Sequence, residues 1–108
     1  MSYDTQLPLF PLGQIMTTPG TNRACLSRPY ILLCLTRHQH GDWGHLCKED
    51  AAANDEAVRS GGRIVSAYPI DPARPCKGYG ENCLWVITEC DRSMTTILLL
   101  PSIDRLSS

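Results

Sequence analysis

The stretch LWVITECDRSMTTILLL, residues 84–100, decides the expected fold of this chain. Its two halves, 84–90 and 94–100, are rich in Ile, Val, Thr, Leu and Trp, and β-branched and aromatic residues favour strands. The intervening residues from Cys90 to Ser93 are of the kind that forms a tight connection. The pattern therefore predicts a β-hairpin.

Working outward from this hairpin, residues 63–70 show the same strand composition, and a shorter strand is expected at 9–17. The segment 71–82 contains two prolines and two glycines and reads as an exposed loop. Helical spacing of apolar residues begins at Leu46 and stops at the glycine pair 61–62. Two further helices are expected at 29–37 and, more weakly patterned, at 19–27.

This order of elements, β-α-α-α-β-β-β, points to the α+β class. We expect an antiparallel sheet of about four strands with two or three helices packed on one face. A chain of 108 residues is the size of one domain, so residues 1–108 are read as a single unit with frayed ends at 1–7 and 102–108.

Composition limits the possible partners. Ten basic and eleven acidic residues leave a formal charge of −1, so nucleic acid is not expected as a direct ligand. No apolar run approaches the roughly 20 residues of a membrane span, and the first ten residues lack the features of an export signal. The sequence therefore predicts a cytoplasmic protein, in which the six cysteines are free thiols.

The densest group of reactive side chains lies in residues 37–47, which contain all three histidines, Asp42 and Cys47. Imidazole and thiolate ligands suit zinc, but the spacings match no zinc motif, so neither a metal nor a cofactor is expected. A second reading pairs a nucleophile, Cys47 or Ser66, with a histidine base, His38 or His45.

An architectural reading of the same loop is favoured over both chemical ones. Trp43 would enter the core, and Asp42 would cap the following helix. Gly41 and Gly44 would supply the positive dihedral angles of a sharp turn. No catalytic residue is assigned, because the sequence contains no motif for a nucleophile elbow, a phosphate loop or a carboxylate pair.

Candidate partner-binding residues come from exposed loops and from the acidic helix face. Loops carry function more often than the elements they connect, and aromatic and charged residues suit interfaces. The candidates are Arg74, Lys77 and Tyr79 on the long loop, His38 and His40 on the histidine-rich loop, and Glu49, Asp55 and Glu56 on the helix.

Several short blocks, in the same order along the chain, resemble a family of small uncharacterised proteins carried on bacterial plasmids, phages and other mobile elements. They are LGQI (12–15) with TPG (18–20), RH (37–38) with GDWG (41–44), and WVITE (85–89) with DRS (91–93) and TT (95–96). The likeness spans about residues 12–101. The family pattern does not include His40, His45 or Cys47, which weakens the metal reading.

The resemblance implies a protein of a bacterial host cell that binds and blocks host machinery. We therefore expect a non-enzymatic protein-binding module, an inhibitor of a host defence complex of the anti-CRISPR or anti-restriction type, whose partner is a host protein or protein complex. The alternative is a small metal-dependent or histidine-assisted hydrolase that uses the 37–47 loop.

Overall fold

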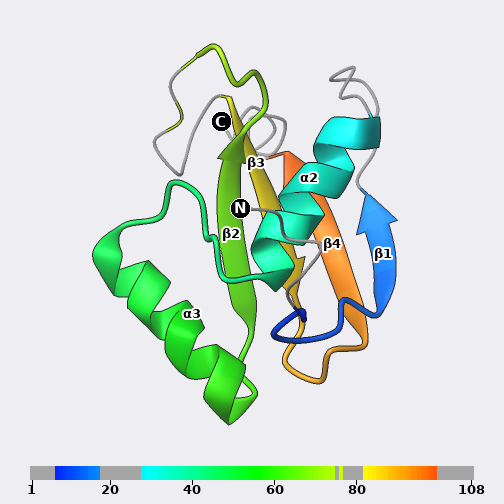
Figure 1. Cartoon of the computed structure of the whole chain (residues 1–108), viewed down its shortest axis with the longest axis vertical. Helices are drawn as coiled ribbons and strands as arrows, with labels where there is room; N and C mark the ends of the chain where they lie inside the picture. Colours follow the sequence, from blue (N-terminus) through cyan, green and yellow to red (C-terminus); the bar gives the residue numbers. More distant parts are fainter. Residues whose placement is uncertain (1–6, 18–27, 75, 77–81, 100–108) are drawn as a thin grey trace, which may run out of the picture.

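The computed structural model describes residues 7–17, 28–74, 76 and 82–99. Its elements follow the chain from a short strand through two helices to three longer strands (Figure 1). They are β1 (Gln14–Thr17), α2 (Arg28–Gln39), α3 (Lys48–Ser60), β2 (Ile64–Pro69), β3 (Cys83–Thr88) and β4 (Met94–Leu99).

The four strands form one sheet in the order β1-β4-β3-β2. β2, β3 and β4 are antiparallel to their neighbours, but β1 runs parallel to β4. The α+β class is confirmed, and the prediction of an antiparallel sheet was wrong for this one strand. A short turn forces the β3-β4 hairpin to be antiparallel, whereas the long connection from β1 to β4 leaves the direction of β1 open.

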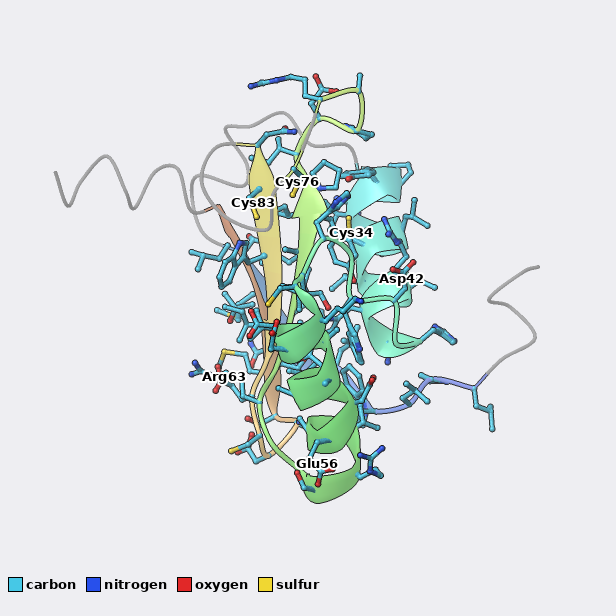
Figure 2. The ribbon with its side chains drawn as sticks, turned by 90° about the vertical axis from the view of Figure 1, so that its left-hand side faces the viewer. Cys34, Asp42, Glu56, Arg63, Cys76 and Cys83 are labelled. Carbon is cyan, nitrogen blue, oxygen red and sulfur yellow. The ribbon has the colours of Figure 1, made fainter. Side chains whose placement is uncertain are left out.

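α2 lies across one face of the sheet, and α3 runs beside its β2 edge (Figure 1 and Figure 2). α2 contributes Cys34 and Leu35 to the main core, where they meet four sheet residues, Tyr68, Leu84, Val86 and Ile97. The expected third helix, at 19–27, and most of the expected frayed ends lie outside the described residues. Within the described ranges, no helix is long and apolar enough to cross a membrane.

α3 ends as its sequence predicts but begins later. Gly61 adopts φ 88° and its N–H reaches the carbonyl of Ala57, the expected left-handed termination. The helix starts at Lys48 with Cys47 at the N-cap, and no side chain caps it. The prediction that Asp42 caps this helix was therefore wrong, because its carboxylate is engaged elsewhere.

Arg92, in the β3-β4 turn, holds the end of α3 against the sheet. Its guanidinium donates to the carbonyls of Ala57 at 2.9 Å and Gly62 at 2.6 Å. A positive charge is favourable at a helix C-terminus, where carbonyl groups lack intrahelical partners. A turn residue therefore also docks a helix.

The two edges of the sheet differ. Along β2, Gly44 forms a parallel bridge to Ala67, and the amide of Asn54 both donates to the carbonyl of Val65 at 2.7 Å and accepts from its N–H at 3.1 Å. These contacts occupy backbone groups that an edge strand otherwise exposes. At the other edge, all four residues of β1 are exposed.

Candidate functional site

A chain of polar side chains crosses the core beneath α2. Nδ1 of His38 lies 2.6 Å from Oγ of Ser66, and Nε2 lies 2.8 Å from Oγ1 of Thr88. The Thr88 hydroxyl in turn lies 2.8 Å from that of Thr95, which donates to the carbonyl of Leu12 at 2.7 Å. These four side chains are fully buried. One helix and all three long strands are thus joined by a single hydrogen-bonded chain.

The last acceptor fixes the direction of every proton in this chain. A carbonyl oxygen can only accept, so Thr95 donates to Leu12 and must accept from Thr88. Thr88 must then accept from Nε2–H of His38. When the ring is neutral it is therefore the Nε2–H tautomer, and its Nδ1 accepts from Ser66.

Burial also keeps His38 uncharged. Loss of solvent and, to a lesser extent, the nearby positive charge of Arg92 lower the pKa of the ring from its usual 6.5 to about 3. Phe10 and Trp43 meet the ring edge-on, at centroid distances of 5.2 and 6.0 Å. Two aromatic rings thus pack against an imidazole whose two nitrogens are both hydrogen-bonded.

The predicted encounter of Ser66 with His38 does occur, but not at an accessible site. Both side chains have zero exposure, so no substrate can reach the hydroxyl in this conformation. The ring does lie between a hydroxyl and a second polar group, as in a catalytic triad, but Thr88 rather than a carboxylate is that group. The pair therefore serves as a core contact.

The buried thiols are poorly suited to nucleophilic attack. Burial raises the pKa of Cys34 to about 11, and burial together with the neighbouring Cys76 raises that of Cys83 to about 12. A thiol of such high pKa is almost wholly protonated near neutral pH and is inert. All five cysteines among the described residues are free.

Asp42 forms a two-pronged ion pair with Arg37 instead of capping a helix. Its carboxylate oxygens lie 2.7 and 3.2 Å from the guanidinium, which also rests 4.7 Å from the ring centre of Tyr68. Tyr68 donates to the main-chain carbonyl of Asp42 at 2.7 Å. This cluster fixes the start of the loop against β2, and it raises the pKa of Arg37 through the bond to Asp42.

Trp43 is buried in the core, as the architectural reading of the loop predicted. The side chain is 7% exposed and stacks beside Phe10, with ring centres 6.5 Å apart. Its indole N–H donates to Asp55 on α3 at 3.0 Å. Gly41 and Gly44 have φ of 86° and 76°, which confirms the predicted positive dihedrals.

The predicted binding residues separate into three groups. His38 is fully buried, so the prediction that it contacts a partner is incompatible with its position. His40 is half-buried, and its Nδ1 lies 2.8 Å from the Thr36 carbonyl. Exposed residues are Arg74 and, on α3, Glu49, Asp55 and Glu56. Lys77 and Tyr79 lie outside the described residues.

Sequence reasoning missed a pocket of about 270 Å³ at the junction of α3 with the outer face of β2 and β3. Alternation along β3 explains the position of Trp85: Leu84 and Val86 face the core, so Trp85 faces the other side. The sequence placed Trp85 on a predicted strand, but not beside residues of α3. The pocket is lined by Leu46, Asp50, Ala53, Asn54, Arg63, Val65 and Trp85.

Neither the loop nor the pocket forms a metal centre among the residues that the structure describes. No three side chains of His, Cys, Asp or Glu in those ranges are grouped closely enough to hold an ion. The chain matches no protein-family model, no curated protein and no solved structure.

Proposed function

We propose that this chain is a non-enzymatic protein-binding module whose contact surface centres on the pocket between α3 and β3. The observation that supports the proposal is the composition of that pocket. Trp85, Val65 and Leu46 provide apolar surface, and Asp50 and Arg63 provide one charge of each sign. Tryptophan and arginine are the residue types most enriched at the energetic centres of protein interfaces.

The size of the pocket favours a protein partner over a small substrate. Its volume of about 270 Å³ is below the range of about 300–1,000 Å³ typical of small-molecule and cofactor sites. A pocket of this size suits one inserted side chain. Arg63 extends from the side of the sheet opposite α2, and in Figure 2 no described helix or strand lies over it. A partner could therefore approach this face directly.

The charge of α3 suggests the character of the partner. The helix carries Glu49, Asp50, Asp55 and Glu56 against only Lys48 and Arg59, so it presents excess negative charge. Complementarity favours a basic surface on the partner. A basic groove that normally holds nucleic acid has this property, and the resemblance to proteins of mobile elements extends the proposal to a CRISPR or restriction complex of the host.

The alternative hydrolase has weaker support. Its nearest approach to a catalytic pair, Ser66 with His38, is sealed in the core. If the chain were nonetheless a hydrolase using this pair, Ser66→Ala would abolish turnover of a model ester while partner binding persisted. A non-enzymatic binding module would turn over no ester, with or without this substitution.

Affinity capture from a host lysate, followed by measurement of Kd with the purified partner, tests the proposal. Trp85→Ala should weaken binding at least about tenfold, since truncating a central anchor costs on the order of 2 kcal/mol. Ile87→Ala is the matched control, because Ile87 is also half-buried on β3 but does not line the pocket. Equal Kd values for Trp85→Ala, Arg63→Ala and wild type, with unchanged melting temperatures, would refute the pocket as the contact surface.

A further inference from the structure

Among the described residues, the outer edge of β1 lacks the protection given to β2. Gln14–Thr17 contains no charged residue and no proline, and no other strand of the described residues pairs with its outer side. Natural edge strands are usually protected by such residues or covered, because bare backbone groups attract another strand. The Gly44 bridge and the Asn54 amide cover β2 in this way, and β1 has no counterpart within the part of the chain that the structure describes.

The parallel pairing with β4 determines which backbone groups of β1 remain open. Gln14 donates to the carbonyl of Ser93 at 3.0 Å and is in register with Met94. In a parallel ladder alternate residues direct both N–H and C=O to the same neighbour. Gln14 and Met16 therefore face β4, and Ile15 and Thr17 present a donor and an acceptor each to the outside.

We propose that two copies of this chain pair through β1, antiparallel, about a two-fold axis at Met16. In this register Ile15 lies opposite Thr17 of the second copy and exchanges both hydrogen bonds with it, and Thr17 does the same with the second Ile15. On each copy, the outward N–H and C=O groups of Ile15 and Thr17 are then all hydrogen-bonded. The two sheets become one continuous sheet.

A second copy fits this edge because the pattern is complementary to itself. Residues 15 and 17 are equally distant from Met16, so a two-fold axis brings like-spaced donors and acceptors together. The absence of charge on the strand removes like-charge repulsion between the copies. Two residues of the strand, Ile15 and Met16, are each 41% exposed and would lose apolar surface to water on pairing.

α2 adds apolar surface on the same side. Tyr30 donates to Pro69 and Arg37 lies over Tyr68, so this side of the helix faces β2. Leu32 follows Tyr30 by two residues, about 200° around the helix, and therefore lies on the side toward β1. It is 56% exposed. Leu32 thus continues the apolar surface that begins at Ile15.

Pairing through β1 would leave the pocket free, since the pocket lies at the α3 and β2 end of the sheet. A dimer would then present two copies of the proposed binding surface, and two-point attachment strengthens binding without new contacts. Four residues a side form a small contact compared with the roughly 1,200–2,000 Å² of stable interfaces. We therefore expect a reversible dimer whose population rises with protein concentration.

Disulfide cross-linking tests the proposed register of the β1–β1 pairing. Opposed Cα atoms at a non-hydrogen-bonded pair are about 4.5 Å apart, within reach of a disulfide, so oxidised Met16→Cys should form a covalent dimer. Residues 1–23 contain no cysteine and no earlier tryptic site, so a disulfide-linked pair of this peptide identifies the 16–16 bond. Gln14→Cys is the control, because its two copies would be about 13 Å apart and beyond that reach.

Light scattering over a concentration series supplies the second measurement. The wild type should approach twice the monomer mass as concentration rises, and Ile15→Lys should stay monomeric with an unchanged melting temperature because it adds edge charge without removing a bond to β4. A wild type that is monomeric throughout, or equal cross-linking of Met16→Cys and Gln14→Cys, would overturn the proposal. Loss of partner binding by Trp85→Ala is independent of either result.

Discussion

Nε2 of His38 lies 2.8 Å from Oγ1 of Thr88, and this contact joins α2 to the central strand β3. The hydrogen-bond directions require Nε2 of His38 to donate here, and the lowered pKa keeps the ring neutral. A histidine that the sequence suggested for binding or catalysis thus acts as a connector between two layers of the fold.

Replacing His38 by alanine should lower the free energy of unfolding by about 3–5 kcal/mol. The change empties a fully buried site and leaves the hydroxyls of Ser66 and Thr88 short of a partner. Denaturant unfolding measures the difference. His45→Ala is the control, since His45 is exposed and should change stability by less than about 0.5 kcal/mol. Equal effects of the two changes would contradict the buried network.

Stability should fall as pH drops from about 6.5 toward 3. The folded state holds the pKa of His38 at about 3, below the unfolded value of 6.5, so between these pH values the unfolded chain binds the extra proton. The contribution of His38 is therefore complete above pH 6.5 and is lost on acidification, by about 2 kcal/mol between pH 7 and 5.

Comparing the pH dependence of wild type and His38→Gln isolates this effect, because glutamine does not titrate. The difference in unfolding free energy between the two proteins should shrink as pH falls through this window. A difference that stays constant from pH 7 to 5 would show that His38 is not held neutral.

Gly44→Ala should destabilise the fold by more than about 3 kcal/mol. A Cβ at this position would lie 1.9 Å from the Ala67 carbonyl oxygen, and its φ of 76° disfavours any side chain. Gly61→Ala separates the two causes, since Gly61 has φ 88° but no atom within 4 Å of the added Cβ. That variant should lose only about 1 kcal/mol, the left-handed cost alone. Similar thermal unfolding of the two variants would argue against the bridge to β2.

Trp43→Ala should cost about 3–5 kcal/mol, because it empties a site between Phe10 and His38. Trp43→Phe keeps most of the ring volume but removes the N–H that Asp55 accepts, and should cost on the order of 1–2 kcal/mol. Thermal melting ranks the three proteins. A stable Trp43→Ala protein that had lost partner binding would instead make Trp43 an interface residue.

Local pattern predicted most of the elements. Strand composition placed β2, β3 and β4 to within about two residues, since β-branched runs next to turn residues leave few alternatives. The glycine pair after Ser60 placed the end of α3. The start of α3 was misplaced because Asp42 had two possible partners, a helix N-terminus and Arg37, and sequence proximity does not rank them.

The candidate pocket was beyond sequence reasoning. Asp50 and Trp85 are far apart in the chain, and they line one pocket only because α3 packs beside β2 and β2 pairs with β3. Strand composition placed Trp85 within residues 84–90 but gave no reason to associate it with Arg63. Contacts between distant segments depend on strand order, which alternation alone does not specify.

The sequence by itself determined the class of the fold, the β3-β4 hairpin and the positive dihedrals at Gly41 and Gly44, since each depends on residues within one turn or one strand. Only the tertiary structure decided that β1 runs parallel to β4, that His38 is buried among hydroxyls, and that all four residues of β1 are exposed. Burial and pairing depend on which distant segments of the chain pack against a residue. The hydrophobic pattern of a strand or helix predicts that a residue is buried, but it does not identify the residues that it contacts.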